Sequence, residues 1–191
     1  MRLFTGIDLP AAQSEALETL IRQLSRLADL RWSRVENLHI TTKFIGQWPQ
    51  ERLDELRERL SMIPAPPSIS IAVRGVGWFP NPHQPKILWA SVQAKDSLEQ
   101  LVRATDESVA ELGIEKDDRP FRPHLTMARI GGRRGGKKRI PDLRALQRAI
   151  GKLPTTDFGE FEARAFHLYL SEPGAHGSRY TKLFSFPLGT T

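Results

Sequence analysis

The sequence predicts an α+β fold of two lobes related by a pseudo-twofold axis, each a mainly antiparallel sheet with outer helices, around a central cleft. Three observations support this prediction. A nine-residue stretch, LHITTKFIG at 38–46, recurs as PHLTMARIG at 123–131. Strand and helix patterns surround both copies in the same order. The period, about 85 to 90 residues, is too long for a solenoid and therefore indicates an internal duplication.

Composition places the chain among ordinary globular proteins. Its 191 residues are 39% hydrophobic and 26% charged, which predicts one two-lobed domain over 1–191. The approximate sequence halves are 1–80 and 86–170, followed by a C-terminal strand at 179–188. The sequence contains no cysteine, which excludes disulfides, thiolate metal sites and cysteine nucleophiles.

The net charge and the N-terminal residues indicate what the protein binds and where in the cell it is found. The formal net charge of +6 favours a polyanionic partner, although a solvated basic surface would have the same charge. The N-terminal stretch reaches Asp8 before the apolar core of a signal peptide could form, so we expect a cytoplasmic location. We expect no membrane association, no obligate protein partner and a monomer.

The first half is predicted to begin with a strand at 2–9 and a helix near Pro10. The apolar residues of that helix recur at helical spacing: Leu17, Leu20, Ile21, Leu24 and Leu27. After the first repeated strand, a second helix has its apolar face at Leu53, Leu56, Leu60 and Ile63. Residues 68–73 alternate polar and apolar, as a half-buried strand does.

The second half repeats this order after a turn at 80–85, which we interpret as the boundary between lobes. A strand at 86–92 is followed by a helix over 98–112, the second repeated strand, and a helix with apolar residues Leu143, Leu146, Ile150 and Leu153. Relative to the first half, five residues are inserted within Gly131–Arg139. Residues 158–170 and 180–188 are predicted as strands joined by a loop.

Each repeated stretch carries His-x-Thr. Because residues two apart on a strand point to the same side, His39 shares a face with Thr41, and His124 with Thr126. Thr42 and Met127 are predicted to point the other way, into the core. The pseudo-twofold would bring the two motif faces together across the cleft.

Two histidines and two threonines predict acid and base chemistry at phosphorus. With an ordinary pKa of about 6.5, one imidazole can accept a proton while the other donates one. Threonine hydroxyls can donate hydrogen bonds to non-bridging phosphate oxygens as charge develops there. This chemistry requires neither a metal nor a cofactor, and no metal-binding motif is evident in the sequence.

Flanking residues are weaker candidates for substrate binding. By strand alternation Lys43 continues the face of His39 and Arg122 that of His124, so both could reach a substrate phosphate. The same alternation places Phe44 and Arg129 on the opposite faces, and they are not predicted to take part. His83, His167 and His176 lack a matching partner in the other half. The five cations of 131–139 could follow an RNA backbone or simply be solvated.

Four stretches resemble a known family: ENLHITTKFIG at 36–46, RPFRPHLTMAR at 119–129, the opening RLFTGIDLP and the ending GSRYTKLFSFPL. They are similar to the RNA 2′,3′-cyclic phosphodiesterases, also called 2′-5′ RNA ligases, of the two-histidine phosphoesterase superfamily. The resemblance implies metal-independent opening of a terminal 2′,3′-cyclic phosphate to a 2′-phosphate. It implies that His39 protonates the leaving 3′-oxygen and that His124 activates water. It also implies that Tyr180 lies near the cleft, where it could stack on a base, although an edge-strand or core tyrosine would fit the same position.

The motifs leave alternatives open. A 2′-5′ ligase acting on tRNA halves would use the same chemistry in reverse, and a phosphodiesterase for small cyclic nucleotides would use the same groups. A non-catalytic module that binds RNA ends is the alternative of a different class, and two intact His-x-Thr motifs favour an enzyme over it. Thr42 and Met127 stand where the family usually has leucine, which bears on packing rather than chemistry.

Overall fold

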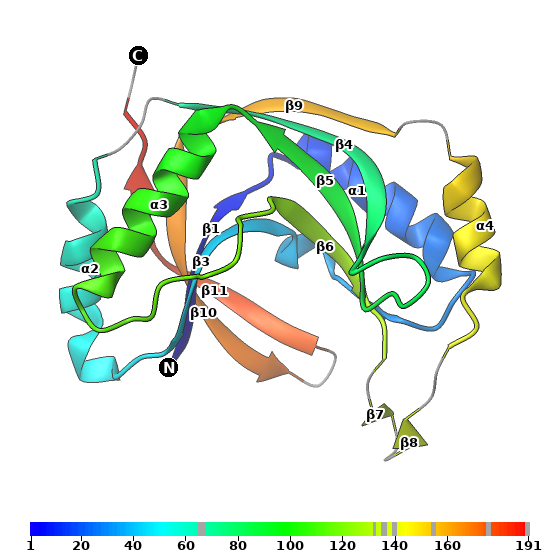
Figure 1. Ribbon diagram of the computed structural model, residues 1–191, viewed down its shortest axis with the longest axis horizontal. Coiled ribbons are helices and arrows are strands. Elements are labelled where there is room, and N and C mark those ends of the chain that lie inside the picture. The colour runs from blue at the N-terminus through cyan, green and yellow to red at the C-terminus, as the bar shows by residue number, and fades with distance from the viewer. Residues whose placement is uncertain are drawn as a thin grey trace.

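The computed structural model describes residues 1–64, 68–131, 141–153, 156–174 and 177–189, and the backbone alone of 133–134 and 137–138. Figure 1 shows two sheets beside each other with helices on the outside. Helices α2 (Leu53–Ser61) and α3 (Asp96–Ala110) lie on one side of the molecule, and α1 (Ala11–Ser25) and α4 (Arg144–Lys152) on the other.

The first sheet has four strands in the order β11-β10-β1-β3, and all neighbours are antiparallel. These are β1 (Arg2–Asp8), β3 (His39–Gln47), β10 (Ala165–Gly174) and β11 (Gly177–Pro187). Its outer helices are α2 and α3, which contact each other, β11 and β3. The first His-x-Thr motif thus lies on the edge strand of this sheet.

The second sheet has five strands in the order β2-β6-β5-β4-β9, again antiparallel. They are β2 (Arg31–Trp32), β4 (Ile69–Phe79), β5 (Ile87–Ala94), β6 (His124–Arg129) and β9 (Asp157–Ala163). Helix α1 packs on β9 and on the short 3₁₀ turn η1 (Val35–Asn37). The second motif lies on β6, between β5 and the two-residue edge strand β2.

Two minor elements complete the described chain. A second 3₁₀ turn, η2 (Gln50–Arg52), precedes α2. The inserted segment forms a short ladder of β7 (Arg133–Arg134) and β8 (Lys137–Lys138), while the side chains of the cations predicted to follow RNA lie outside the described residues. Among the described helices none is long and apolar enough to cross a membrane.

The apolar stripes of the helices cover the sheets as the periodicity predicts. Leu17 of α1, Leu56 of α2, Leu101 of α3 and Leu146 of α4 are all fully buried. One member of the predicted stripes differs: Leu27 is 40% exposed, because α1 ends at Ser25. Burial of these stripes supplies most of the driving force that holds helices to sheets.

The α+β fold with two sheets and outer helices is confirmed, but the sheets do not coincide with the sequence halves. Strand β4 of the first half pairs with β5 of the second, and β10 of the second half pairs with β1 of the first. The turn at 80–85, predicted as a lobe boundary, instead connects β4 to β5 within one sheet. The physical reason is that antiparallel strands joined by a short connection pair most readily with each other.

Candidate active site

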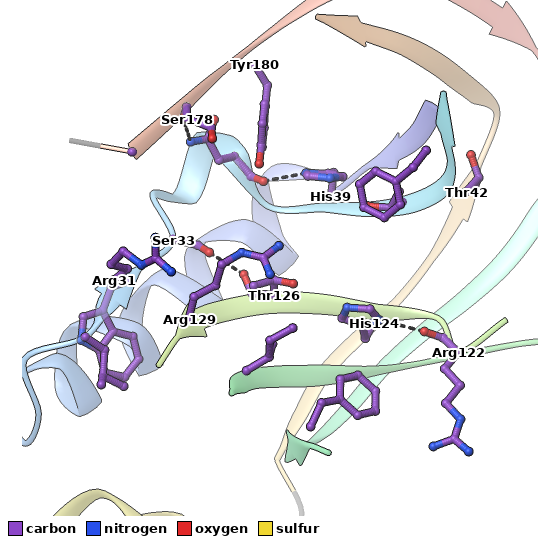
Figure 2. Close-up of a pocket in the computed structure, with 18 of the residues that line it drawn as sticks. Arg31, Ser33, His39, Thr42, Arg122, His124, Thr126, Arg129, Ser178 and Tyr180 are labelled. Atoms are coloured by element: carbon purple, nitrogen blue, oxygen red, sulfur yellow. Dashed lines mark hydrogen bonds between the residues drawn. The ribbon is translucent and has the colours of Figure 1, made fainter. Parts of the chain in front are cut away.

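The two motif strands contact each other across a cleft of about 2430 Å³. His39, Thr41, His124 and Thr126 all line it, as predicted. Figure 2 shows β3 above β6 in this cleft, with the side chains of His39, Thr126 and His124 near the space between the strands.

Strand pairing determines which side chains share the cleft face of the first sheet. On β1, Phe4, Gly6 and Asp8 alternate and therefore point to one side. Their Cα partners on β3 are Phe44, Thr41 and His39, respectively. The step from Thr41 to Phe44 spans three residues opposite two, which is a β-bulge centred on Thr42. His39, Thr41 and Phe44 consequently share one face.

The second sheet repeats this arrangement. On β5, Ile87, Trp89 and Ser91 alternate, and their Cα partners on β6 are Arg129, Thr126 and His124. The bulge in this strand falls at Met127, the position equivalent to Thr42. His124, Thr126 and Arg129 therefore share one face.

The two bulges correct the predicted substrate-binding residues. After a bulge the alternation of a strand is reversed, so Phe44 replaces Lys43 on the cleft face and Arg129 replaces Ala128. Phe44 is 59% exposed, and both Phe44 and Arg129 line the cleft. Simple alternation had placed these two residues on the opposite faces, and the residue pattern contains no signal of either bulge.

Lys43 borders the same cleft, but it is a buried structural cation, 2% exposed. Its ammonium forms an ion pair with the carboxylate of Asp106 on α3 and donates hydrogen bonds to Asp117 Oδ2 at 3.2 Å and to the carbonyl of Glu115 at 2.7 Å. These three acceptors match the three N–H donors of an ammonium group. Lys43 therefore ties β3 to α3 and has no donor left for a substrate phosphate.

The residues at the two bulges have different environments. The Thr42 hydroxyl is buried and lies 2.7 Å from the hydroxyl of Thr5 on β1, so the polar residue at this position has a hydrogen-bond partner. Met127 is completely buried. Both positions thus serve packing, as predicted.

Both imidazoles are oriented by a carbonyl two residues earlier in the chain. His39 Nδ1 lies 2.7 Å from the Asn37 carbonyl oxygen, and His124 Nδ1 lies 2.8 Å from that of Arg122. A carbonyl can only accept, so Nδ1 carries the hydrogen in each ring. Each Nε2 is then left to accept a proton when the ring is neutral or to donate one when it is charged.

The charges around the two imidazoles differ. Burial lowers the pKa of both His39 and His124, and the positive charge of Arg129 lowers both further. The carboxylate of Asp8 acts on His39 in the opposite direction and raises its pKa. The position opposite His124 that corresponds to Asp8 is held by Ser91, which is uncharged.

Asp8 is itself held in a polar network. Its carboxylate accepts hydrogen bonds from the Tyr169 hydroxyl and the Lys182 ammonium, and His167 Nε2 lies 3.5 Å away. Burial alone would raise the pKa of Asp8, but the hydrogen bonds from Lys182 and Tyr169 bring it below its usual value. His167 therefore belongs to the polar network around Asp8.

An aromatic ring meets each histidine edge-on. The rings of Tyr180 and His39 have centroids 5.1 Å apart at 90°, and those of Phe79 and His124 are 5.1 Å apart at 83°. Tyr180 lies at the cleft, as expected, and Phe79 was not predicted. The rings restrict the orientations available to the imidazoles.

The remaining predicted residues are less centrally placed. Arg122 lines the cleft and its carbonyl orients His124, but in Figure 2 its guanidinium extends away from His39. His83 is exposed on the turn between β4 and β5, and His176 lies outside the described residues. Within the described part of the chain no group of three His, Asp or Glu side chains could hold a metal ion.

Comparisons with known proteins agree with this architecture. A family model described as LigT like phosphoesterase matches residues 7–89 and 90–180, so nearly the whole chain is covered in two consecutive segments. The chain is 33% identical over 186 residues to an Archaeoglobus fulgidus protein named RNA 2′,3′-cyclic phosphodiesterase, covering 97% of this chain and 99% of the relative. A Methanocaldococcus jannaschii protein of the same name is 34% identical, covering 94% and 96%.

Solved structures share the fold. A Thermus thermophilus protein superposes with a TM-score of 0.78 at 28% identity, covering 98% of both chains. Escherichia coli LigT complexed with 3′-AMP superposes with a TM-score of 0.77 at 24% identity, covering 98% of this chain and 97% of LigT, a likeness of fold alone.

Proposed function

Because the chain belongs to the LigT-like phosphoesterase family, we propose that it is a hydrolase that opens the terminal 2′,3′-cyclic phosphate of RNA to a 2′-phosphate. The observation that carries this proposal is the pair of His-x-Thr motifs on equivalent strands of two sheets, facing one cleft. Each imidazole there has its Nδ1 bound to a carbonyl and its Nε2 available for proton transfer. Relatives named RNA 2′,3′-cyclic phosphodiesterase, which match over nearly their whole length, support the substrate class.

In the proposed reaction a water molecule attacks phosphorus and the 3′-oxygen leaves. His124 Nε2 accepts a proton from the water as its oxygen bonds to phosphorus. His39 Nε2 donates a proton to the 3′-oxygen as the bond between phosphorus and that oxygen breaks. The product carries a 2′-phosphate and a 3′-hydroxyl, and exchange of protons with solvent restores both histidines.

The charges beside the histidines support this division of roles. A general acid must hold its proton at the working pH, and a general base must have lost it. Asp8 favours the protonated form of His39, whereas His124 faces the neutral Ser91, and Arg129 disfavours the protonated form of both rings. The same asymmetry would make His39 the better acid and His124 the better base.

Three further groups would bind the reacting phosphate. The hydroxyls of Thr41 and Thr126 share the faces of the histidines and can donate to non-bridging oxygens. Arg129 shares the cleft face of Thr126 and His124, and Figure 2 shows its side chain beside Thr126, so its guanidinium could stabilise negative charge between the imidazoles. Phe44 and Tyr180 supply aromatic surface on which the terminal base could stack.

Product analysis tests the proposal directly. A short oligoribonucleotide with a 2′,3′-cyclic phosphate end is incubated with the protein, with and without an acceptor RNA that bears a 5′-hydroxyl. We expect an oligonucleotide with a 2′-phosphate in both cases, and none from a variant with both histidines replaced by alanine. A 3′-phosphate product, or tight binding without turnover, would contradict the proposed reaction. The cytoplasmic location and the monomeric state stay predictions.

A further inference from the structure

Two arginines lie directly opposite each other on the cleft face of the second sheet. Arg31 on β2 is the Cα partner of Arg129 on β6, so both side chains leave the sheet on the side of His124 and Thr126. Both line the cleft, and Figure 2 shows them next to each other at the same end of β6. Like charges at directly opposed positions of a sheet repel, which makes this an unfavourable pair without an anion between or beside them.

The ion pairs of the described residues leave these two arginines without a carboxylate partner. Among the described residues no carboxylate forms an ion pair with Arg31 or Arg129. Two other cations that line the cleft are neutralised: Arg34 pairs with a glutamate at 2.8 Å, and Lys43 with two aspartates. Arg103, Arg119 and Arg122 also line the cleft without an ion pair among the described residues, but none of them is paired with Arg129 on the sheet. The opposed arginines are therefore available to an external anion.

Their position relative to the histidines indicates which anion. Arg129 lies two ladder positions beyond Thr126, roughly 7 Å along the strand at about 3.3 Å per residue, and Arg31 lies one strand further, roughly 5 Å across. Arg129 is among the charges that lower the pKa of both imidazoles, and Figure 2 shows its side chain beside Thr126, with Arg31 farther from both histidines. Arg129 can thus reach the reacting phosphate, while Arg31 lies about one nucleotide step away from it.

We propose that Arg31, together with Arg129, forms a second phosphate-binding site that holds the phosphodiester on the 5′ side of the terminal nucleotide. This inference rests on the proposed function, because it places a cyclic phosphate end between the two histidines. A guanidinium binds a phosphodiester through paired, charge-assisted hydrogen bonds. The enzyme would accordingly act on oligonucleotides in preference to nucleoside 2′,3′-cyclic phosphates, which lack that linkage.

The test compares three substrates with the wild type and Arg31→Gln. The substrates are a nucleoside 2′,3′-cyclic phosphate, a dinucleotide with the same end, and that dinucleotide with an uncharged methylphosphonate linkage. For the natural dinucleotide, Arg31→Gln should lower kcat/KM roughly 10- to 100-fold, the range for loss of a hydrogen bond to a charged group. For the other two substrates the variant should equal the wild type, since both lack the charge that Arg31 binds.

Arg34→Gln is the matched control, because Arg34 lies three residues away, lines the same cleft and already pairs with Glu36. It should treat all three substrates as the wild type does. A wild type that hydrolyses the mononucleotide and the dinucleotide equally well, or an equal loss on all substrates in Arg31→Gln, would overturn the second site and leave the proposed function standing. Absence of hydrolysis of any substrate by the wild type would overturn the proposed function itself. Calorimetric affinities for the 2′-phosphorylated mononucleotide and dinucleotide then decide whether Arg31 binds the linkage.

Discussion

Asp8 lies directly opposite His39 on the neighbouring strand, whereas Ser91 occupies the corresponding place opposite His124. The two halves of the site are otherwise closely matched in their histidines, threonines and bulges. Together with the cation Arg129 at the place equivalent to Phe44, this difference in charge breaks the symmetry of two groups that must carry opposite protonation states.

Replacing Asp8 by Asn should change only one limb of the pH dependence of kcat/KM. The carboxylate raises the pKa of His39, so its removal lowers that pKa and His39 loses its proton at lower pH. We expect the alkaline limb of kcat/KM to move to lower pH and the rate above neutrality to fall by up to about 10-fold, the effect of one pKa unit. Imidazole NMR titration should show the shift at His39 and not at His124. Equal shifts at both rings, or the same effect from Ser91→Ala, would refute the asymmetry.

Replacing Arg129 by Gln should shift the acid and alkaline limbs of the pH–rate profile in the same direction. Its positive charge lowers the pKa of His39 and of His124, so both should titrate at higher pH in the variant, and the whole bell should move to higher pH. Loss of phosphate stabilisation should also lower kcat roughly 10²-fold. A pH–rate series on a cyclic phosphate substrate measures both effects. An unshifted profile would mean that the guanidinium is remote from the imidazoles in solution.

His39→Ala and His124→Ala should each lose about 10² to 10⁴ in rate while remaining folded. The double variant should be little worse than either single one, because groups that act as a unit are not additive. A substrate whose leaving group needs no protonation should rescue His39→Ala and not His124→Ala. Exposed His83, replaced by alanine, serves as the control and should leave the rate unchanged. Rescue of both variants to the same degree would contradict the assignment of His39 as the acid and His124 as the base.

Lys43→Met should reduce stability rather than chemistry. Removing one member of a buried ion pair leaves the other uncompensated, and since Asp106 is 17% exposed we expect roughly 2 to 3 kcal/mol of destabilisation. Adding Asp106→Asn should recover part of that loss. Phe44→Ser should do the opposite and weaken substrate binding with little change in the denaturation midpoint. If Lys43→Met had normal stability but bound phosphate poorly, Lys43 would lie on the cleft face, as simple alternation along β3 predicts.

Activity should persist in excess chelator, because the proposed proton transfers and charge stabilisation use only side chains of this chain. The measurement is the turnover of a cyclic phosphate substrate after dialysis against EDTA, next to a zinc-dependent phosphatase as a positive control for chelation. Loss of turnover that a divalent ion restores would contradict the proposed chemistry.

The sequence predicted the helices, most strands, the repeated motif and the family resemblance, because each depends on local periodicity or on short residue patterns. The cleft residues that the sequence did not predict are placed by the pairing between strands. The bulges at Thr42 and Met127 exchange Lys43 for Phe44 and bring Arg129 into the cleft, and a bulge is visible only in the register against β1 or β5. Strand β2 was missed because two residues carry no periodicity.

The assignment of strands to sheets was also beyond the sequence. Residues 158–170 have one continuous strand-like pattern, yet the chain leaves β9 in the second sheet and enters β10 in the first at Arg164. Both strands satisfy the same apolar pattern, so only long-range packing decides which sheet each one joins.

The exchange of strands between the two sheets determines how the cleft can move. Hinge closure needs rigid bodies that are joined at a few flexible positions. Here the backbone passes repeatedly from one sheet to the other, at α1, between β2 and β3, between α2 and β4, on both sides of α3, and between β9 and β10. Rotation of one sheet against the other would strain all of these crossings at once. The spacing of the two imidazoles is therefore preset by the framework, and a substrate must enter a site that does not close around it by a hinge.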